Sequence, residues 1–301
     1  MKLSWGWAFD GVNASIPRNT GPECSEYLSI KRHWIEGVIV CFMCCCALKW
    51  AVKNSKALKV NYSTVHSMTA GKQLLQIVMT FTLGLELGFK LSQRSVIYIL
   101  NPCHITTIIQ IYLLAARPCK STTALFRIHL NYLNGPLLAY VFPEIESRTI
   151  PFEACTYYIQ HGLMFIIPIY LLRQGGAYNM EDLCDMKWNI IGYSLLLIYH
   201  FSILVIFAVP SQINLNHVLC PALSDPFQTT NFRLCAVVHE ALLCTLLCKI
   251  YCIVFRPTNP NLNFTVNIID KSNATVLSND NTGCDDDIHD YQKRNHVEKM
   301  D

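Results

Sequence analysis

Residues 187–209 read KWNIIGYSLLLIYHFSILVIFAV, and Lys187 carries the only charged side chain in this stretch. An α-helix rises about 1.5 Å per residue, so a helix of this length crosses a hydrocarbon core about 30 Å thick. Six other apolar stretches predict further transmembrane helices, near 34–53, 74–92, 95–117, 123–142, 154–172 and 233–255. The sequence therefore predicts an all-α fold, a polytopic membrane protein built as a bundle of about seven transmembrane helices.

The composition agrees with a chain that uses lipid as part of its solvent. Of the 301 residues, 52% are hydrophobic and 15% are charged, whereas a water-soluble domain of this size needs a larger polar fraction at its surface. The net charge of +3 is small and no basic block is interleaved with aromatic residues, so we expect no nucleic-acid partner. Most of the 15 cysteines lie in apolar runs, where thiols behave as small hydrophobes, so they predict neither a disulfide scaffold nor a compartment.

Three regions follow from this pattern. Residues 1–33 form an N-terminal segment without an apolar signal-peptide core, so we expect the first membrane helix to target the protein. Residues 34–256 form the transmembrane domain. Residues 257–301 are rich in Asn, Asp, Ser and Thr, with an acidic cluster at Asp285, Asp286 and Asp287, and we expect a disordered tail.

The distribution of charge in the loops predicts the orientation. Cytoplasmic loops are enriched in Lys and Arg, and here the first and third predicted loops carry most of these cations, while the loop after residue 142 is acidic. This bias places the N-terminus in the lumen (or outside) and the C-terminus in the cytosol, although Lys31 and Arg32 argue the other way. Asn13, in Asn-Ala-Ser, would then be an available glycosylation acceptor.

Polar side chains within the predicted spans gather near one depth. Intramembrane ionisable residues are costly and indicate function by default. At 1.5 Å per residue, seven of them from six spans lie roughly 9–14 Å from the predicted outer end. A single such residue often only bonds between helices, but the shared level favours a functional pocket. These residues are Glu86, Cys103, His104, Asn134, His161, His200 and His239. The spacing Gly84-x-x-x-Gly88, in contrast, indicates close helix packing alone.

Cys103 stands in the sequence Asn101-Pro102-Cys103-His104. Asn101 is expected as the N-cap and Pro102 as the first helical residue, which places Cys103 in the first turn, where the helix dipole favours a thiolate. His104 would point about 100° away from Cys103, so it is a poor base for it. A histidine from another span, His161 or His200, fits better, and a thiolate paired with an imidazole is suited to covalent acyl transfer.

Several blocks of this sequence resemble the transmembrane protein 164 family. The resemblance runs from about residue 8 to residue 256. The matching blocks fall in the family's order and include Gly84–Lys90, Leu100–His104, Ile111–Pro118, Tyr157–His161, Pro168–Leu172, Gly175–Tyr178, Tyr199–Ser202, Asn214–Asn216, Leu219–Ala222 and Ser224–Phe227.

The resemblance implies a membrane acyltransferase with a cysteine at its centre. Such an enzyme moves a polyunsaturated acyl chain from a diacyl phospholipid to a lysophospholipid, notably an ether-linked phosphatidylethanolamine, in the endoplasmic reticulum. Carried over, the nucleophile is Cys103 and the essential histidine is His161. Glu86, Asn101 and Asn134 are candidates to orient the imidazole or bind the oxyanion. The sequence contains no phosphate loop, nucleotide motif or zinc signature, so we expect neither a cofactor nor a metal, and coenzyme A need not take part.

Three other functions stay open at this point. A seven-helix receptor shares the topology, although the chain lacks the Asp-Arg-Tyr and Asn-Pro-x-x-Tyr sequences of the common receptor class. A metal- or haem-binding redox protein could use His161, His200 and His239. A lipid hydrolase would differ from the transferase only in using water as the acyl acceptor.

Overall fold

The computed structural model describes residues 5–58 and 69–255, and every regular element in this part of the chain is a helix. Five helical segments are long and apolar enough to cross a membrane: α2 (Ile30–Asn54), α3 (Ala70–Ser92), α7 (Glu153–Gln174), the continuous run Lys187–Ser211 and α10 (Phe232–Val254). The predicted all-α polytopic fold is confirmed. The predicted tail 257–301 and residues 59–68 of the loop 54–73 lie outside the described residues.

The two remaining predicted spans are helical but broken. The span near 95–117 consists of a 3-10 turn, η2 (Val96–Leu100), followed by α4 (Pro102–Ala115). Asn101 between them is extended (φ −61°, ψ 141°), because a residue before proline is driven out of the helical region. The span near 123–142 consists of α5 (Lys120–His129), η3 (Leu130–Tyr132) and α6 (Asn134–Val141). The break precedes Gly135 and Pro136, a poor helix former and a residue without a backbone N–H.

The sixth predicted span also changes its winding. It begins as α8 (Lys187–Ile198), continues as a π-helical segment, η4 (Tyr199–Leu204), and ends as α9 (Val205–Ser211). A π-helical turn carries one extra residue and is frequent at functional sites. The first span begins at Ile30 and not near residue 34, because the Ser29 side chain caps it by accepting a hydrogen bond from the Arg32 N–H.

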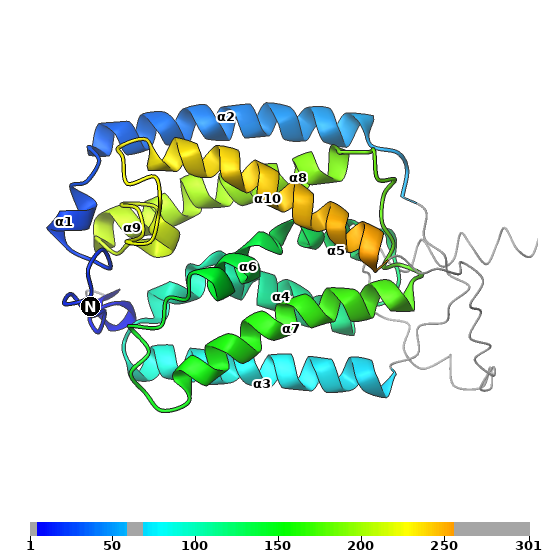
Figure 1. Cartoon of the computed structure of the whole chain (residues 1–301), viewed down its shortest axis with the longest axis horizontal. Helices are drawn as coiled ribbons and strands as arrows, with labels where there is room; N and C mark the ends of the chain where they lie inside the picture. The colour runs from blue at the N-terminus through cyan, green and yellow to red at the C-terminus, as the bar shows by residue number, and fades with distance from the viewer. Residues whose placement is uncertain (1–4, 59–68, 256–301) are drawn as a thin grey trace, which may run out of the picture.

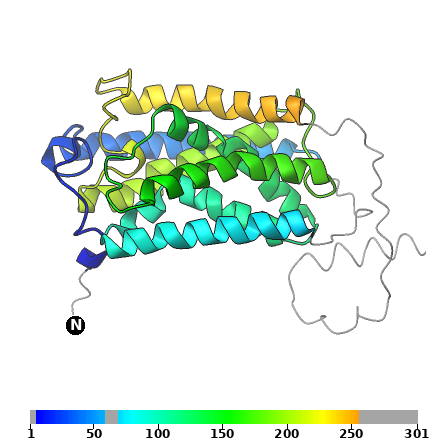
Figure 2. The same ribbon diagram turned by 60° about the horizontal axis from the view of Figure 1, so that its bottom comes forward.

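The helices form two groups joined by the broken fourth span. In Figure 1, α2 packs on α8 and α10 lies beside them, while α3 packs on α4 and α7. The α5–η3–α6 segment runs between the groups, since α5 and η3 contact α8, η3 also contacts α10, and α6 contacts α7. Figure 2 shows the same bundle from the side of α3 and α7. The main core, around Leu113, Phe126 and Met164, is apolar.

The outward faces of the long helices are apolar as well. Large hydrophobic side chains on them are exposed, among them Phe42, Phe81 and Leu242. Many ionisable and amide side chains are instead buried inside the bundle. Apolar exteriors suit contact with lipid, where intramembrane polar groups turn inward and pair with one another.

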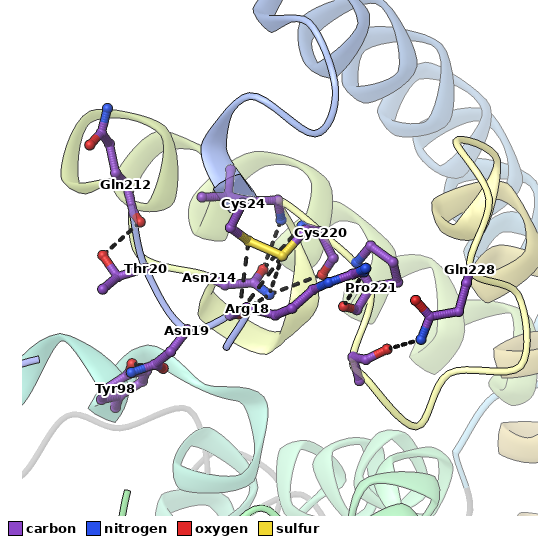
Figure 3. Close-up of a disulfide and its surroundings, with 12 residues drawn as sticks. Arg18, Asn19, Thr20, Cys24, Tyr98, Gln212, Asn214, Cys220, Pro221 and Gln228 are labelled. Carbon is purple, nitrogen blue, oxygen red and sulfur yellow. Dashed lines mark hydrogen bonds between the residues drawn. A yellow bond between two sulfur atoms is a disulfide. The ribbon is translucent and has the colours of Figure 1, made fainter. Parts of the chain in front are cut away.

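A cap of irregular chain covers the end of the bundle where α4, α7 and α10 begin. It consists of the N-terminal segment with η1 (Trp5–Ala8) and α1 (Pro22–Ser25), and of the loop that follows α9 with η5 (Leu215–His217). A disulfide between Cys24 and Cys220 joins the two parts (Figure 3). The sequence had not predicted this bond, because most of the cysteines lie in apolar runs; these two lie outside the apolar spans, in loops that the fold brings together.

The cap is also tied to the turn before α4. The Tyr98 hydroxyl on η2 donates to Asn19 Oδ1 at 2.5 Å, and the backbone N–H of Gly11 donates to the Arg94 carbonyl at 3.1 Å. Arg94 pairs with Asp10 at 3.1 Å. The N-terminal segment therefore bridges the disulfide and the backbone that leads to Cys103 (Figure 3).

Candidate functional site

Cys103 lies in the first turn of α4, on the cap side of the bundle. Asn101 occupies the N-cap position and Pro102 is the first helical residue, as the sequence predicted, but the Asn101 side chain makes no capping hydrogen bond. Its Oδ1 is buried without a partner. The Tyr199 hydroxyl, at the start of the π-helical segment, donates to the Leu100 carbonyl at 2.6 Å and holds this turn in place.

A buried charge cluster surrounds the turn, with Glu86 of α3 at its centre. Arg148, from the loop that joins α6 and α7, donates through Nη1 to both Glu86 oxygens at 3.1 and 3.0 Å. Lys90 Nζ lies 3.6 Å from Glu86 and 3.3 Å from Glu153 at the start of α7. Gln93 also donates to Glu153, at 2.9 Å. Buried charges are tolerated only when they are paired in this way.

His104 is fully engaged in this cluster. Its Nδ1 accepts a hydrogen bond from the Gln160 amide at 3.2 Å, so the ring proton resides on Nε2, which faces Glu86 Oε1 at 3.9 Å. The same amide donates to Thr107 Oγ1 at 2.9 Å, and the Thr107 hydroxyl donates to the Cys103 carbonyl at 2.9 Å. His104 therefore anchors the first turn of α4 to α7 and to α3, and has no lone pair to act as a base.

His161, on α7, has the opposite arrangement. Its Nδ1 donates to the Tyr157 carbonyl at 2.8 Å, because a carbonyl can only accept. The lone pair is therefore on Nε2, which makes no hydrogen bond with any described residue. The imidazole packs against the Tyr157 ring, 4.3 Å between centroids, and the Arg148 guanidinium lies 4.4 Å from the centre of the same ring. This is the tautomer that a general base requires.

Cys103 and His161 belong to one cluster but do not bond. Glu86 faces His104, the chain neighbour of Cys103, and the Arg148 guanidinium that binds Glu86 lies against the same Tyr157 ring as His161. Within residues 5–58 and 69–255, no hydrogen bond joins the Cys103 thiol to His161. The cluster therefore assembles a thiol, a base and a buried arginine near one turn, with no hydrogen bond between the thiol and the base.

Two other predicted residues meet at a second place, between α6 and α10. Asn134 donates to Glu240 Oε2, and His239 Nε2 lies 3.5 Å from Glu240 Oε1. The Cys244 thiol is 3.8 Å from the same carboxylate. Glu240 was missed by the sequence analysis, although an acidic residue inside the span 233–255 was a visible signal.

His200 lies at a third place, in the π-helical segment. Its Nδ1 accepts from the Asn216 amide at 3.2 Å. Close by, Arg233 of α10 is buried and pairs with His33 at 2.8 Å and with Glu36 at 3.1 Å, both on α2. The seven residues of the predicted layer thus divide into three groups: Glu86, Cys103, His104 and His161; Asn134 and His239; and His200.

Five members of the first group were missed from the sequence: Lys90, Arg148, Glu153, Tyr157 and Gln160. In the sequence, Arg148 and Glu153 belong to the loop whose charges predict the orientation, and no local pattern shows that this loop turns its polar side chains inward. Lys90 lies one helical turn after Glu86, and Gln160 directly precedes His161. The position of each next to a predicted site residue was a signal that it could belong to the site.

The three histidines proposed for a metal or haem lie in three different groups. His161 bonds to Tyr157, His200 to Asn216, and His239 to Glu240. Among the described residues, no three His, Cys, Asp or Glu side chains are placed to hold one ion.

Comparisons with known proteins agree with the resemblance in the sequence. The model of the TMEM164 family matches residues 27–251. The Transmembrane protein 164 homolog of Dictyostelium discoideum is 30% identical over 151 residues, which cover 50% of this chain and 54% of that protein. The chain therefore matches about half the length of this curated relative. No solved structure matches the chain.

Proposed function

Since the chain belongs to the TMEM164 family, we propose that it is a membrane phospholipid acyltransferase that carries the acyl chain on Cys103. The observation that carries this proposal is that one cluster contains both a candidate nucleophile, the Cys103 thiol, and a candidate base, the His161 imidazole. Cys103 lies in a helix first turn, in the same cluster as His161, whose Nε2 lone pair is unused by any described residue. The donor is a diacyl phospholipid, and the acceptor is a lysophospholipid such as a lyso (ether) phosphatidylethanolamine.

The reaction takes two steps. His161 Nε2 removes the Cys103 thiol proton, and the thiolate sulfur attacks the ester carbonyl carbon of the donor. The ester C–O bond breaks, the leaving alkoxide takes the proton from His161, and a thioester remains on Cys103. The acceptor hydroxyl then gives its proton to His161 and attacks the thioester, the C–S bond breaks, and the thiolate takes the proton back. The step requires Cys103 and His161 to close up once lipid binds, which is common in catalytic sites.

The location of the cluster suits a lipid substrate. It lies at the cap end of the bundle, near the ends of α3, α4 and α7, where lipid esters meet the headgroup layer. The Cys24–Cys220 disulfide supports a lumenal cap, because disulfides persist in the oxidising secretory compartments and not in the cytosol. This agrees with the loop charges, so we propose an endoplasmic-reticulum protein with a lumenal N-terminus and a cytosolic C-terminus.

The test is acyl transfer in reconstituted vesicles. Purified protein is given labelled phosphatidylcholine and ether-linked lysophosphatidylethanolamine. We expect transfer by the wild type and a loss of more than about 100-fold in Cys103→Ala and in His161→Ala. Cys155→Ala, at an exposed thiol on α7, and His239→Ala, at the second group, are matched controls that keep activity.

Two results would contradict the proposal. Transfer that survives the loss of Cys103 would show that the acyl group is not carried there. Release of free fatty acid without transfer would assign water as the acceptor and make the protein a hydrolase.

A further inference from the structure

Arg148 is a buried arginine on an otherwise exposed loop. The loop 142–152 carries exposed apolar side chains, including Phe142, Ile145 and Phe152, yet the Arg148 side chain is only 9% exposed. The loop lies on the cap side of the bundle, between α6 and α7. Exposed aromatic and aliphatic residues at this level would contact the lipid boundary, so Arg148 enters the cluster from the headgroup layer.

The guanidinium uses one of its three nitrogens. Nη1 donates to both oxygens of Glu86. Nε is fully buried and has no hydrogen-bond partner. Nη2 makes no hydrogen bond with any residue of the described ranges. Nε and Nη2 together form the side-on fork of an arginine, which matches two oxygens of a phosphate or carboxylate. A buried donor without a partner is costly, so this fork is suited to a ligand.

We propose that this fork of Arg148 binds the phosphate of the donor phospholipid and so fixes the ester near Cys103, an inference that rests on the proposed function. Glu86 holds the guanidinium from the other side, and the Tyr157 ring supports its face at 4.4 Å. His104, which follows Cys103 in the first turn of α4, faces Glu86 at 3.9 Å, and Arg148 Nη1 lies 3.0 Å from the same carboxylate, so a phosphate on the fork lies near the turn that carries the thiol. Arg148 is therefore a substrate-binding residue that selects phosphorylated lipids over neutral ones.

The surrounding charges allow an anion at this place. Lys90 lies within 3.6 Å of Glu86 and 3.3 Å of Glu153, so both carboxylates keep a cationic partner when Arg148 also serves a ligand. The His104 Nε2–H faces Glu86 as well, at 3.9 Å. A fork on a loop at the headgroup layer favours the lipid phosphate over the oxyanion of the reacting carbonyl as the bound group.

The experiment measures binding without turnover. Purified protein in detergent is exposed to a photoreactive diacyl phosphatidylcholine and, separately, to a photoreactive diacylglycerol with the same acyl chains. The main variant is Glu86→Gln/Arg148→Gln, which removes both charges so that neither is left buried alone. We expect phosphatidylcholine labelling to fall at least about 10-fold, since charge-assisted bonds are lost, and diacylglycerol labelling to change less than about twofold.

Three further variants sharpen the result. Glu86→Gln alone keeps the fork and an oxygen acceptor for Nη1, and should lose less phosphatidylcholine labelling than the double variant. Arg148→Lys keeps the charge without the fork and should lose most of it. Arg233→Gln is the matched control, because Arg233 is also a buried arginine paired with a carboxylate, and its partner Glu36 retains Arg32 at 2.6 Å. Its labelling should equal that of the wild type.

Two outcomes overturn the inference. Intact phosphatidylcholine labelling in the double variant would show that Arg148 does not bind phosphate. An equal decline of both probes in a variant with unchanged melting temperature would assign the fork to the reacting carbonyl or to the acyl site. Because labelling needs no acyl transfer, the labelling experiment tests phosphate binding by Arg148 independently of the transfer assay, which tests the proposed activity.

Discussion

His104 and His161 lie in the same cluster, and their hydrogen-bond partners place the ring proton on a different nitrogen in each. The Gln160 amide fixes the proton of His104 on Nε2, toward Glu86, whereas the Tyr157 carbonyl fixes the proton of His161 on Nδ1. One ring is thereby a fixed donor and the other keeps a free lone pair. The residue that adjoins Cys103 in the chain is the anchor, and the residue from another helix is the candidate base.

A second pair of residues, His217 and Glu144, forms an ion pair in the loops of the cap end. It should make the free energy of unfolding depend on pH. Burial lowers the pKa of His217, but the charge and hydrogen bond of Glu144 outweigh this effect and raise the pKa above its ordinary 6.5. Burial raises the pKa of Glu144, but the charge and hydrogen bond of His217 outweigh this effect and lower it below 4.5. The pair therefore stabilises the folded state fully between about pH 4.5 and about pH 6.5.

The contribution is lost as the pH rises through the raised pKa of His217, and as it falls through the lowered pKa of Glu144. Both side chains are partly exposed, so the effect should be below about 1 kcal/mol. We expect Glu144→Gln to lower the melting temperature at about pH 5.5 and to have no effect at about pH 9. An equal effect at both pH values would show that the pair is not ionised in the fold.

The residues of the site were only partly predictable. Cys103, His161, Glu86 and His104 were found because a polar side chain inside an apolar span is conspicuous. Arg148 was missed because its sequence neighbours are polar loop residues, and only the fold shows that its side chain enters the bundle and reaches Glu86 across 62 residues. Glu153 was missed for the same reason. Local composition indicates where a loop is, and tertiary packing decides which way its side chains turn.

At the scale of elements, close helix packing occurs at Gly192 and not at the glycine pair that the sequence favoured. A Cβ at Gly84 or Gly88 of α3 would have no neighbour within 4 Å, so the expectation of close packing at these two glycines was wrong. A Cβ at Gly192 of α8 would lie 2.8 Å from the Asn131 Cβ. Asn131 accepts a hydrogen bond from Asn189 at 2.6 Å, so this contact joins α8 to the broken fourth span.

Gly192→Ala should therefore destabilise the protein by about 1–3 kcal/mol, because the new methyl group displaces Asn131 from its hydrogen bonds. Gly84→Ala is the matched control on an open helix face and should be neutral or stabilising by up to about 1 kcal/mol. Thermal unfolding in detergent, followed by circular dichroism, measures both. Similar losses in the two variants would mean that helix glycines matter here through something other than the Asn131 contact.

The positions of the membrane helices were predictable from apolar length, and their breaks were predicted only in part: the helix start at Pro102 was predicted, whereas the break before Pro136 was not. The apolar runs 95–117 and 123–142 correspond to α4 and to the α5–α6 segment, each interrupted near a proline. Pro102 and Pro136 each stand at the start of a new helix. The π-helical winding at His200 had no signal, because an inserted residue changes the hydrogen-bond register without changing the composition.

At the scale of the whole molecule, the orientation can be tested at the two ends of the bundle. Asn13 is exposed in the cap, and Cys184 is exposed in the loop between α7 and α8, at the opposite end. With a lumenal cap we expect an N-linked glycan that Asn13→Gln abolishes, seen as a mobility shift after glycosidase treatment. In intact microsomes, a membrane-impermeant maleimide should label the wild-type protein more than it labels the Cys184→Ser variant. An unglycosylated Asn13 together with a Cys184 that the maleimide does not label would show that the orientation is the opposite of the proposed one.

The bond between Cys24 and Cys220 also constrains how the chain is made. The two cysteines are 196 residues apart, and every membrane segment except α10 lies between them. With the proposed lumenal cap, the second cysteine reaches the oxidising compartment during synthesis only after an even number of crossings has been inserted. If either of the two interrupted segments failed to insert alone, the cysteines would face opposite sides of the membrane and stay reduced. The disulfide therefore forms only when the preceding membrane segments are correctly inserted, and a quality-control system could detect it before the last helix is complete.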